Sequence, residues 1–172
     1  MGNKKDYHEC LSTPFETGIR NFTSVAKYFL YYAPNIDSAQ STGKISEDRA
    51  EFLIKAMLDS NGLSKRAKIL KKIQPRSWKC YGLDNDCIDF EKPCIVIDKY
   101  GLETDFQAVI RHLRNALAHG YIYVWKKKKK GNYVFFVDFD PKKNKITAKI
   151  LISMKILEDW KALIENEIAL GE

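Results

Sequence analysis

Residues 111–121 contain the side chains whose types and spacing could do chemistry. They read Arg-His-Leu-Arg-Asn-Ala-Leu-Ala-His-Gly-Tyr. On a helical wheel Asn115 and His119 are four residues apart and share one face, while Arg114 lies on its flank and Arg111 lies one turn earlier. An arginine, an asparagine and a histidine therefore share the polar side of a helix whose opposite side is apolar.

Such a set of side chains can cleave RNA without a metal ion. The ribose 2′-hydroxyl must lose a proton as it attacks phosphorus, and the leaving 5′-oxygen must gain one; a histidine can serve in either step near neutral pH. An arginine fork suits the charge that develops on the phosphate. We therefore expect His119 to be the acid–base group, Arg114 the phosphate clamp and Asn115 an orienting group for the imidazole or a phosphate oxygen. The products would be a 2′,3′-cyclic phosphate and a 5′-hydroxyl.

Each of these histidines also has a purely structural interpretation. A histidine in a last helical turn often only caps carbonyl groups and complements the helix dipole, which is the alternative for His119. His112 lies one turn before Asn115 and could enter the same site. We interpret it instead as a hydrogen-bonded histidine at the surface.

The run Arg114-Asn115-Ala116-Leu117-Ala118-His119 resembles the Arg-x4–6-His signature of HEPN domains, which is often Arg-Asn-x3-His. The rest of the chain is similar too, with predicted helices upstream, the motif at the end of a later helix, and a closing helix. The resemblance implies an endoribonuclease without a cofactor, which acts on RNA as a homodimer with a composite active site. It also implies a role in phage defence, in a toxin–antitoxin system or in RNA processing. The alternative is a HEPN module that holds RNA or a nucleotide without cleaving it.

Some HEPN toxins extend the motif to Arg-x4-His-x-Tyr, and a partner nucleotidyltransferase modifies the tyrosine. His119-Gly120-Tyr121 matches this extension. The resemblance therefore implies that Tyr121 is a possible modification site and that an antitoxin or a nucleotidyltransferase is a possible partner. Otherwise Tyr121 is an aromatic residue that opens a strand.

A run of five lysines follows at residues 126–130, directly before Gly131-Asn132. At the tip of a hairpin these lysines could contact RNA phosphates, so we assign Lys126, Lys127 and Lys128 to RNA binding together with Arg111. A solvated turn of charges explains the run equally well. The net charge of +7 favours an anionic partner.

The sequence offers little support for a metal site. Asp138 and Asp140 are two residues apart and could hold Mg²⁺, but no Glu or His joins them at metal-ligand spacing. Cys80, Cys87 and Cys94 are evenly spaced, whereas zinc ligands usually come in close pairs. We therefore expect no metal and interpret the cysteines as reduced thiols.

The elements that must position the motif are mostly helical in this interpretation. Thr104 and Gln107 have the spacing of a capping box that begins the motif helix, and Gly120 ends it. Apolar periodicity predicts four further helices at about 14–32, 46–60, 64–73 and 153–170. Alternating segments at 121–125, 133–139 and 146–152 predict an antiparallel β meander over 121–152. Residues 75–103 are harder to interpret, and 94–97 could be a short buried strand or part of a loop.

The length and composition of the chain favour a single domain without a membrane span. A chain of 172 residues that is 45% hydrophobic favours one domain over residues 1–172, with a loose leader at 1–13. No apolar run approaches the roughly 18–20 residues that a membrane span needs, and the N-terminus lacks a signal-peptide core, so we expect a cytoplasmic protein without a membrane partner. The expected fold class is mainly α: a HEPN-like helical bundle with a small antiparallel β meander inserted before the last helix.

Overall fold

The computed structural model describes residues 18–33, 45–60, 62–84, 87–88, 92–127 and 131–169. Its helical segments are α1 (Phe22–Lys27), η1 (Tyr28–Tyr32), α2 (Glu47–Asp59), η2 (Ser64–Arg66), α3 (Pro75–Cys80), α4 (Asp105–His119) and α5 (Met154–Ala169). Its strands are β1 (Ala67–Leu70), β2 (Leu83–Asp84), β3 (Cys87–Ile88), β4 (Cys94–Asp98), β5 (Ile122–Lys127), β6 (Gly131–Asp140) and β7 (Lys145–Ser153). The predicted leader at 1–13 lies outside the described residues.

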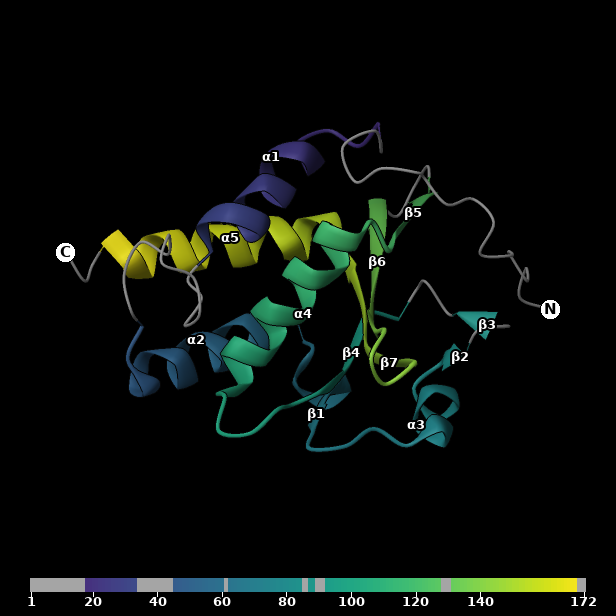
Figure 1. The fold of residues 1–172 in the computed structure, drawn as a ribbon. Coiled ribbons are helices and arrows are strands. Elements are labelled where there is room, and N and C mark those ends of the chain that lie inside the picture. The colour runs from purple at the N-terminus through teal and green to yellow at the C-terminus, as the bar shows by residue number, and fades with distance from the viewer. Residues whose placement is uncertain are drawn as a thin grey trace.

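A five-stranded mixed sheet forms the centre of the structure, with strand order β1-β4-β7-β6-β5 (Figure 1). The pair β1–β4 is parallel, and the other neighbours are antiparallel. Strand β7 lies between β4 and β6, so that Ala148 is in register with Ile97 on one side and with Asp138 on the other. A separate antiparallel pair, β2–β3, comes from the segment between β1 and β4.

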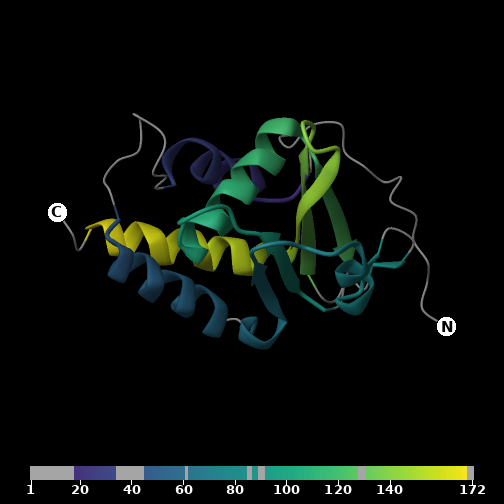
Figure 2. The ribbon, with the colours of Figure 1, turned by 60° about the horizontal axis from the view of Figure 1, so that its bottom comes forward.

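Two layers cover the sheet. Helices α1, α2, α4 and α5 gather on one face, whereas α3 lies with β2 and β3 on the other side (Figures 1 and 2). Strand β4 contributes side chains to the cores on both faces of the sheet. Ile95 and Ile97 belong to the helix-side core, whereas Cys94 and Val96 belong to the smaller core on the opposite face. A strand that is buried on both faces has a continuous apolar sequence, which is what Cys94-Ile-Val-Ile97 shows.

The expected fold class is wrong. The strands over 122–153 are not a small meander inserted into a helical bundle, because they share one sheet with β1 and β4. The predicted helix at 64–73 is also wrong, since a short 3₁₀ segment is followed there by β1. Residues 67–70 pair with 95–98, and this pairing overrides their weak helical periodicity.

Helix α4 carries the motif and begins and ends where the sequence predicts. The capping box is complete, because Thr104 Oγ1 accepts from the Gln107 amide and Gln107 Oε1 accepts from the Thr104 amide. The apolar face of the helix, centred on Phe106, Leu113 and Leu117, is buried in the helix-side core. Ser46 likewise caps α2 as predicted. None of the helices in the described segments is long and apolar enough to cross a membrane.

Gly120 ends α4 directly after His119 with a left-handed φ of 72°. A Cβ added there would meet no atom within 4 Å, so a substitution costs only backbone strain. We expect Gly120→Ala to lower the free energy of unfolding by about 1–2 kcal/mol. Gly120→Asn should cost less, because asparagine adopts this conformation more readily. Urea denaturation measures both, and equal losses in the two variants would contradict the explanation.

Candidate functional site

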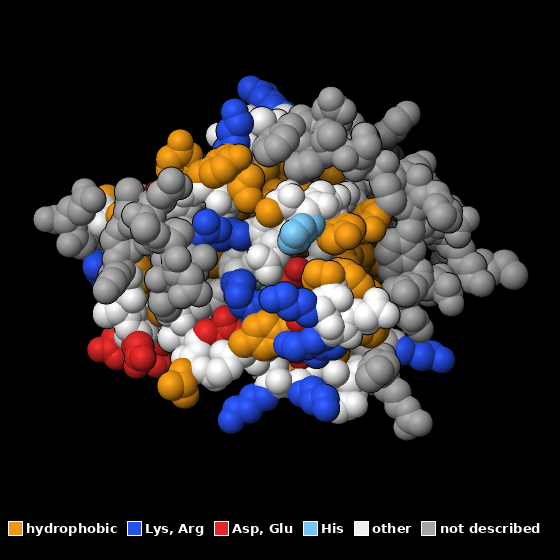
Figure 3. Space-filling model, in the orientation of Figure 1, with side chains coloured by type: hydrophobic (Ala, Val, Ile, Leu, Met, Phe, Trp, Pro, Cys, Tyr) orange, Lys and Arg blue, Asp and Glu red, His pale blue; other side chains and the backbone are white. Residues whose placement is uncertain are grey.

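His119 is exposed at the last residue of α4. Its ring lies 6.2 Å from the ring of Tyr121, measured between centroids, with a tilt of 34°. Tyr121 is itself 41% exposed. On this face of the molecule a histidine side chain is bordered by hydrophobic side chains, with an acidic side chain just below it and lysine or arginine side chains farther away (Figure 3). The imidazole is therefore accessible to a large anionic ligand.

Arg114 is only partly exposed, and one of its nitrogens is fully covered. Nη1 is buried and has no hydrogen-bond acceptor among the described residues. A buried donor of a charged group without an acceptor costs free energy, so this guanidinium is suited to an acceptor supplied from outside the described part of the chain.

The single chain does not join Arg114 to His119. They are five positions apart along the helix, which corresponds to about 140° around the helix axis. No hydrogen bond between the two side chains is present in the described part of the structure. One copy of the motif therefore does not form a closed arginine–histidine pair.

Asn115 connects the motif to the sheet. Its Nδ2 donates to Oδ2 of Asp138 on β6 at 3.1 Å. The same Oδ2 lies 2.7 Å from Nδ1 of His112 and accepts from the Thr147 hydroxyl at 3.3 Å. Three side chains thus converge on one carboxylate oxygen, and Asp138 is only 4% exposed.

His112 spans the sheet from β4 to β6. It is completely buried, with Nε2 2.6 Å from the carbonyl oxygen of Asp98 and Nδ1 2.7 Å from Asp138. Each ring nitrogen thus faces a hydrogen-bond acceptor, and Nη2 of Arg111 also lies 3.1 Å from Nε2. Between them lies Ala148, whose small side chain leaves room for the ring above β7. The expected surface position of His112 is wrong.

The pKa of Asp138 reflects these contacts. Burial raises the pKa of the carboxyl, but the hydrogen bond from His112, the attraction to its charge, and the hydrogen bonds from Asn115 and Thr147 outweigh burial. The net pKa lies below its ordinary value of 3.8. Asp138 is therefore an ionised acceptor at neutral pH.

The Arg111 guanidinium contacts several neighbouring groups of the protein. Its guanidinium makes two bonds to the Glu103 carboxylate, at 2.7 and 2.9 Å, and donates to the Asp98 carbonyl at 3.1 Å. It also lies 4.4 Å from the centre of the Tyr100 ring. Burial raises the pKa of Glu103, but the bonds from Arg111 and the Tyr100 amide lower it overall. These contacts tie the start of α4 to the end of β4, and RNA binding by Arg111 stays a prediction.

The lysine run is only partly described. Lys126 and Lys127 end β5, but their side chains lie outside what the structure describes, as does the whole of Lys128. Their assignment to RNA binding stays a prediction.

The carboxylates considered for Mg²⁺ have other partners. Asp140 accepts the backbone amides of Lys142 and Lys143 in the turn between β6 and β7, while Asp138 faces His112. Within the described segments no three His, Cys, Asp or Glu side chains are grouped closely enough to hold a metal ion. Cys80 is an exposed thiol, the buried Cys94 thiol donates to the Tyr81 carbonyl, and the Cys87 side chain lies outside the described part.

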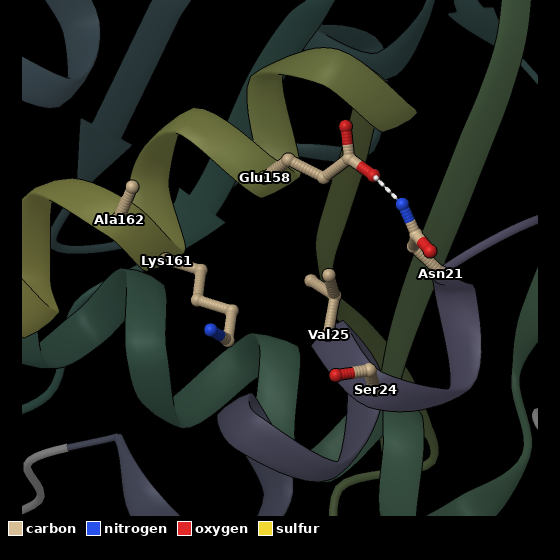
Figure 4. Close-up of a pocket in the computed structure, with 6 residues that line it drawn as sticks. All are labelled: Asn21, Ser24, Val25, Glu158, Lys161 and Ala162. Carbon is tan, nitrogen blue, oxygen red and sulfur yellow. Dashed lines mark hydrogen bonds between the residues drawn. The ribbon is translucent and has the colours of Figure 1, made fainter.

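Other hollows on the surface are lined by residues outside the motif. One lies between α1 and α5, where Asn21 donates to Glu158 and Lys161 donates to Glu165 along α5 (Figure 4). Its volume is about 250 Å³. A neighbouring hollow of about 500 Å³ is lined by Ser24, Lys27, Tyr28, Tyr32, Lys161 and Glu165. The mixture of charges and internal pairs in these hollows does not single out one ligand.

Sequence reasoning missed Asp138 as the partner of the motif. A signal was present, since Val134, Phe136 and Asp138 occupy alternate positions of one strand and the first two point into the helix-side core. A carboxylate in such a series needs a buried partner. His112 is that partner.

The lowered pKa of Asp138 gives a prediction for the stability of the fold in acid. Because the pKa of Asp138 is lowered by folding, its stabilisation is complete above the pKa of the unfolded chain and is lost as the pH falls through the folded value. We expect the free energy of unfolding to fall below roughly pH 4, and to fall less steeply in Asp138→Asn. Urea denaturation across this pH range measures the slope.

Asp159→Asn is the matched control for this measurement. Asp159 forms an exposed i,i+4 pair with Lys155 on α5, which contributes little to stability. The explanation is wrong if this control flattens the acid slope as much as Asp138→Asn does.

The fold and the site together define a class. The motif is presented at the exposed end of a helix that is fixed on a mixed sheet by a buried polar network. The family model described as HEPN pEK499 p136 matches residues 18–167, and the chain belongs to this family. Neither a curated protein nor a solved structure matches the chain. Membership gives a nuclease or RNA-binding module as the coarse function.

Proposed function

We propose that this protein is a metal-independent endoribonuclease. In this proposal the ribose 2′-hydroxyl attacks the neighbouring phosphorus, and cleavage leaves a 2′,3′-cyclic phosphate and a 5′-hydroxyl. His119 transfers the proton and Arg114 stabilises the charge that develops on the phosphate. DNA lacks the nucleophile and should stay intact.

One observation carries the proposal most directly. His119 is exposed at the end of a firmly anchored helix, while Arg114 on the same helix has a buried nitrogen without an acceptor among the described residues. A phosphate oxygen or a second protomer can provide such an acceptor. The HEPN family supports the same chemistry, since its members include ribonucleases.

The separation of Arg114 from His119 supports a composite site. Because the two side chains diverge around α4, a homodimer that places two copies of the motif face to face could bring the arginine of one subunit to the histidine of the other. The RNA would lie between the two subunits. Residues 126–128 would add phosphate contacts at the end of the β5–β6 hairpin.

The first test is the loss of cleavage in motif variants. We expect His119→Ala and Arg114→Ala each to lower the rate of RNA cleavage at least about 100-fold, because each removes a group that acts in the transition state. Lys155→Ala, which removes an exposed charge on α5, is the matched control and should keep full activity. Gel assays with tRNA, mRNA and DNA, with and without EDTA, give the rates, and circular dichroism checks the fold.

Two outcomes would contradict the proposal. Cleavage retained by both motif variants would remove His119 and Arg114 from the site. Cleavage lost in EDTA and restored by Mg²⁺ would show a metal-dependent reaction.

The same variants test the composite site. If the arginine and the histidine of one site come from different subunits, mixing inactive Arg114→Ala and His119→Ala proteins restores roughly a quarter of the sites, because half of the dimers are mixed and each has one intact site. A mixture as inactive as its components argues against shared sites.

Tyr121 is proposed as a regulatory position. Its side chain is 41% exposed and its ring neighbours that of His119. A nucleotide attached to its hydroxyl would cover the imidazole and add negative charge where RNA phosphates approach. We therefore propose a nucleotidyltransferase or another antitoxin as a partner, with action in phage defence or a toxin–antitoxin system. The intact mass of the protein, co-expressed with a nucleotidyltransferase encoded beside it, should rise by one or more nucleotides in wild type and stay unchanged in Tyr121→Phe.

A further inference from the structure

The orientation of the Asn115 amide is fixed by its neighbour. Asp138 is an ionised carboxylate and can only accept hydrogen bonds, so the amide nitrogen of Asn115, rather than its oxygen, must face it. The 3.1 Å contact from Nδ2 to Oδ2 has this arrangement. The Oδ1 atom of Asn115 then lies on the other branch of the amide, away from Asp138.

Asp138 is itself held in place. Its Oδ2 is bound by His112 and by Thr147, and His112 is bound in turn to the Asp98 carbonyl of β4. The carboxylate therefore cannot turn without breaking its buried hydrogen bonds to His112 on α4 and Thr147 on β7. A rigid acceptor behind Asn115 gives its amide one orientation.

We propose that Asp138 is a positioning residue that presents Oδ1 of Asn115 to the substrate, and that this oxygen accepts a hydrogen bond from the ribose 2′-hydroxyl of RNA. The inference rests on the proposed function and names the substrate group that the site recognises. Asn115 shares one helix face with His119, so the hydroxyl would be held on the side where the imidazole is exposed.

The chemistry of the two partners favours this assignment over a phosphate contact. Phosphate oxygens are acceptors and gain nothing from an amide oxygen, whereas a 2′-hydroxyl can donate to it. The same hydroxyl is absent from DNA. Asn115 thereby becomes a residue that distinguishes ribose from deoxyribose, and Asp138 the residue that gives it this property.

The test measures a ratio of affinities in a protein that does not cleave. In the His119→Ala background we compare the Kd for an RNA oligonucleotide with the Kd for the same sequence carrying 2′-fluoro groups, which cannot donate. We expect a preference for RNA of roughly tenfold or less, as one hydrogen bond gives. Adding Asn115→Ala or Asp138→Ala should abolish the preference, so that both strands bind with the same Kd.

Lys149→Ala is the matched control. Lys149 is a buried charged residue on β7 that donates to the Leu83 carbonyl on the opposite face of the sheet. It should destabilise the protein without changing the affinity ratio, so a merely structural effect is recognised. If Asp138→Ala does not fold, Asp138→Asn replaces it and should reduce the preference, because its amide no longer fixes Asn115 in one orientation.

The outcomes separate the inference from the proposed function. A preference for RNA that survives in the Asp138 variants, or that falls equally in Lys149→Ala, overturns the inference even when wild type cleaves RNA. A wild-type protein that cleaves nothing, combined with a preference that Asp138 controls, overturns the nuclease proposal and keeps the inference. Equal affinity for both strands in the His119→Ala parent overturns the inference directly.

Discussion

The ion pair between His112 and Asp138 is the constraint on which the motif helix depends. It joins the buried side of α4 to β6, while the second nitrogen of His112 binds β4. Removing His112 would leave Asp138 as a buried charge without this partner, which typically costs about 3–5 kcal/mol. Helix α4 is therefore held in one position on the sheet, and this also fixes where its polar side chains lie.

Linked ionisable side chains surround the start and the middle of α4. Glu103 binds Arg111, Arg111 lies beside the His112 ring, and His112 binds Asp138. The Arg111 guanidinium is thus compensated by Glu103 within the protein. Toward the end of the helix, Arg114 Nη1 has no hydrogen-bond partner among the described residues and His119 is exposed, and these are the two groups to which we assign the proposed chemistry.

Local signals in the sequence predicted local structure well. The capping box at Thr104 and Gln107, the stop at Gly120 and the cap at Ser46 depend only on neighbouring residues, and all are present. The number of strands in the sheet was underestimated, because the pairing of 67–70 with 95–98 depends on residues far apart in sequence. The types of the motif residues were readable, but the burial of His112 and its contact with Asp138 follow from how β6 faces α4. Periodicity within one segment contains no information on that arrangement.

The position of His112 across β7 also bears on the order in which the chain folds. Its two partners lie on β4 and β6, which are neighbours of β7 rather than of each other, so the imidazole reaches both only after β7 has been inserted between them. Pairing of β4 with β7 joins residues more than fifty positions apart, a non-local contact that forms slowly. We therefore expect the motif helix to be anchored late in folding, after β7 has paired with both of its neighbours.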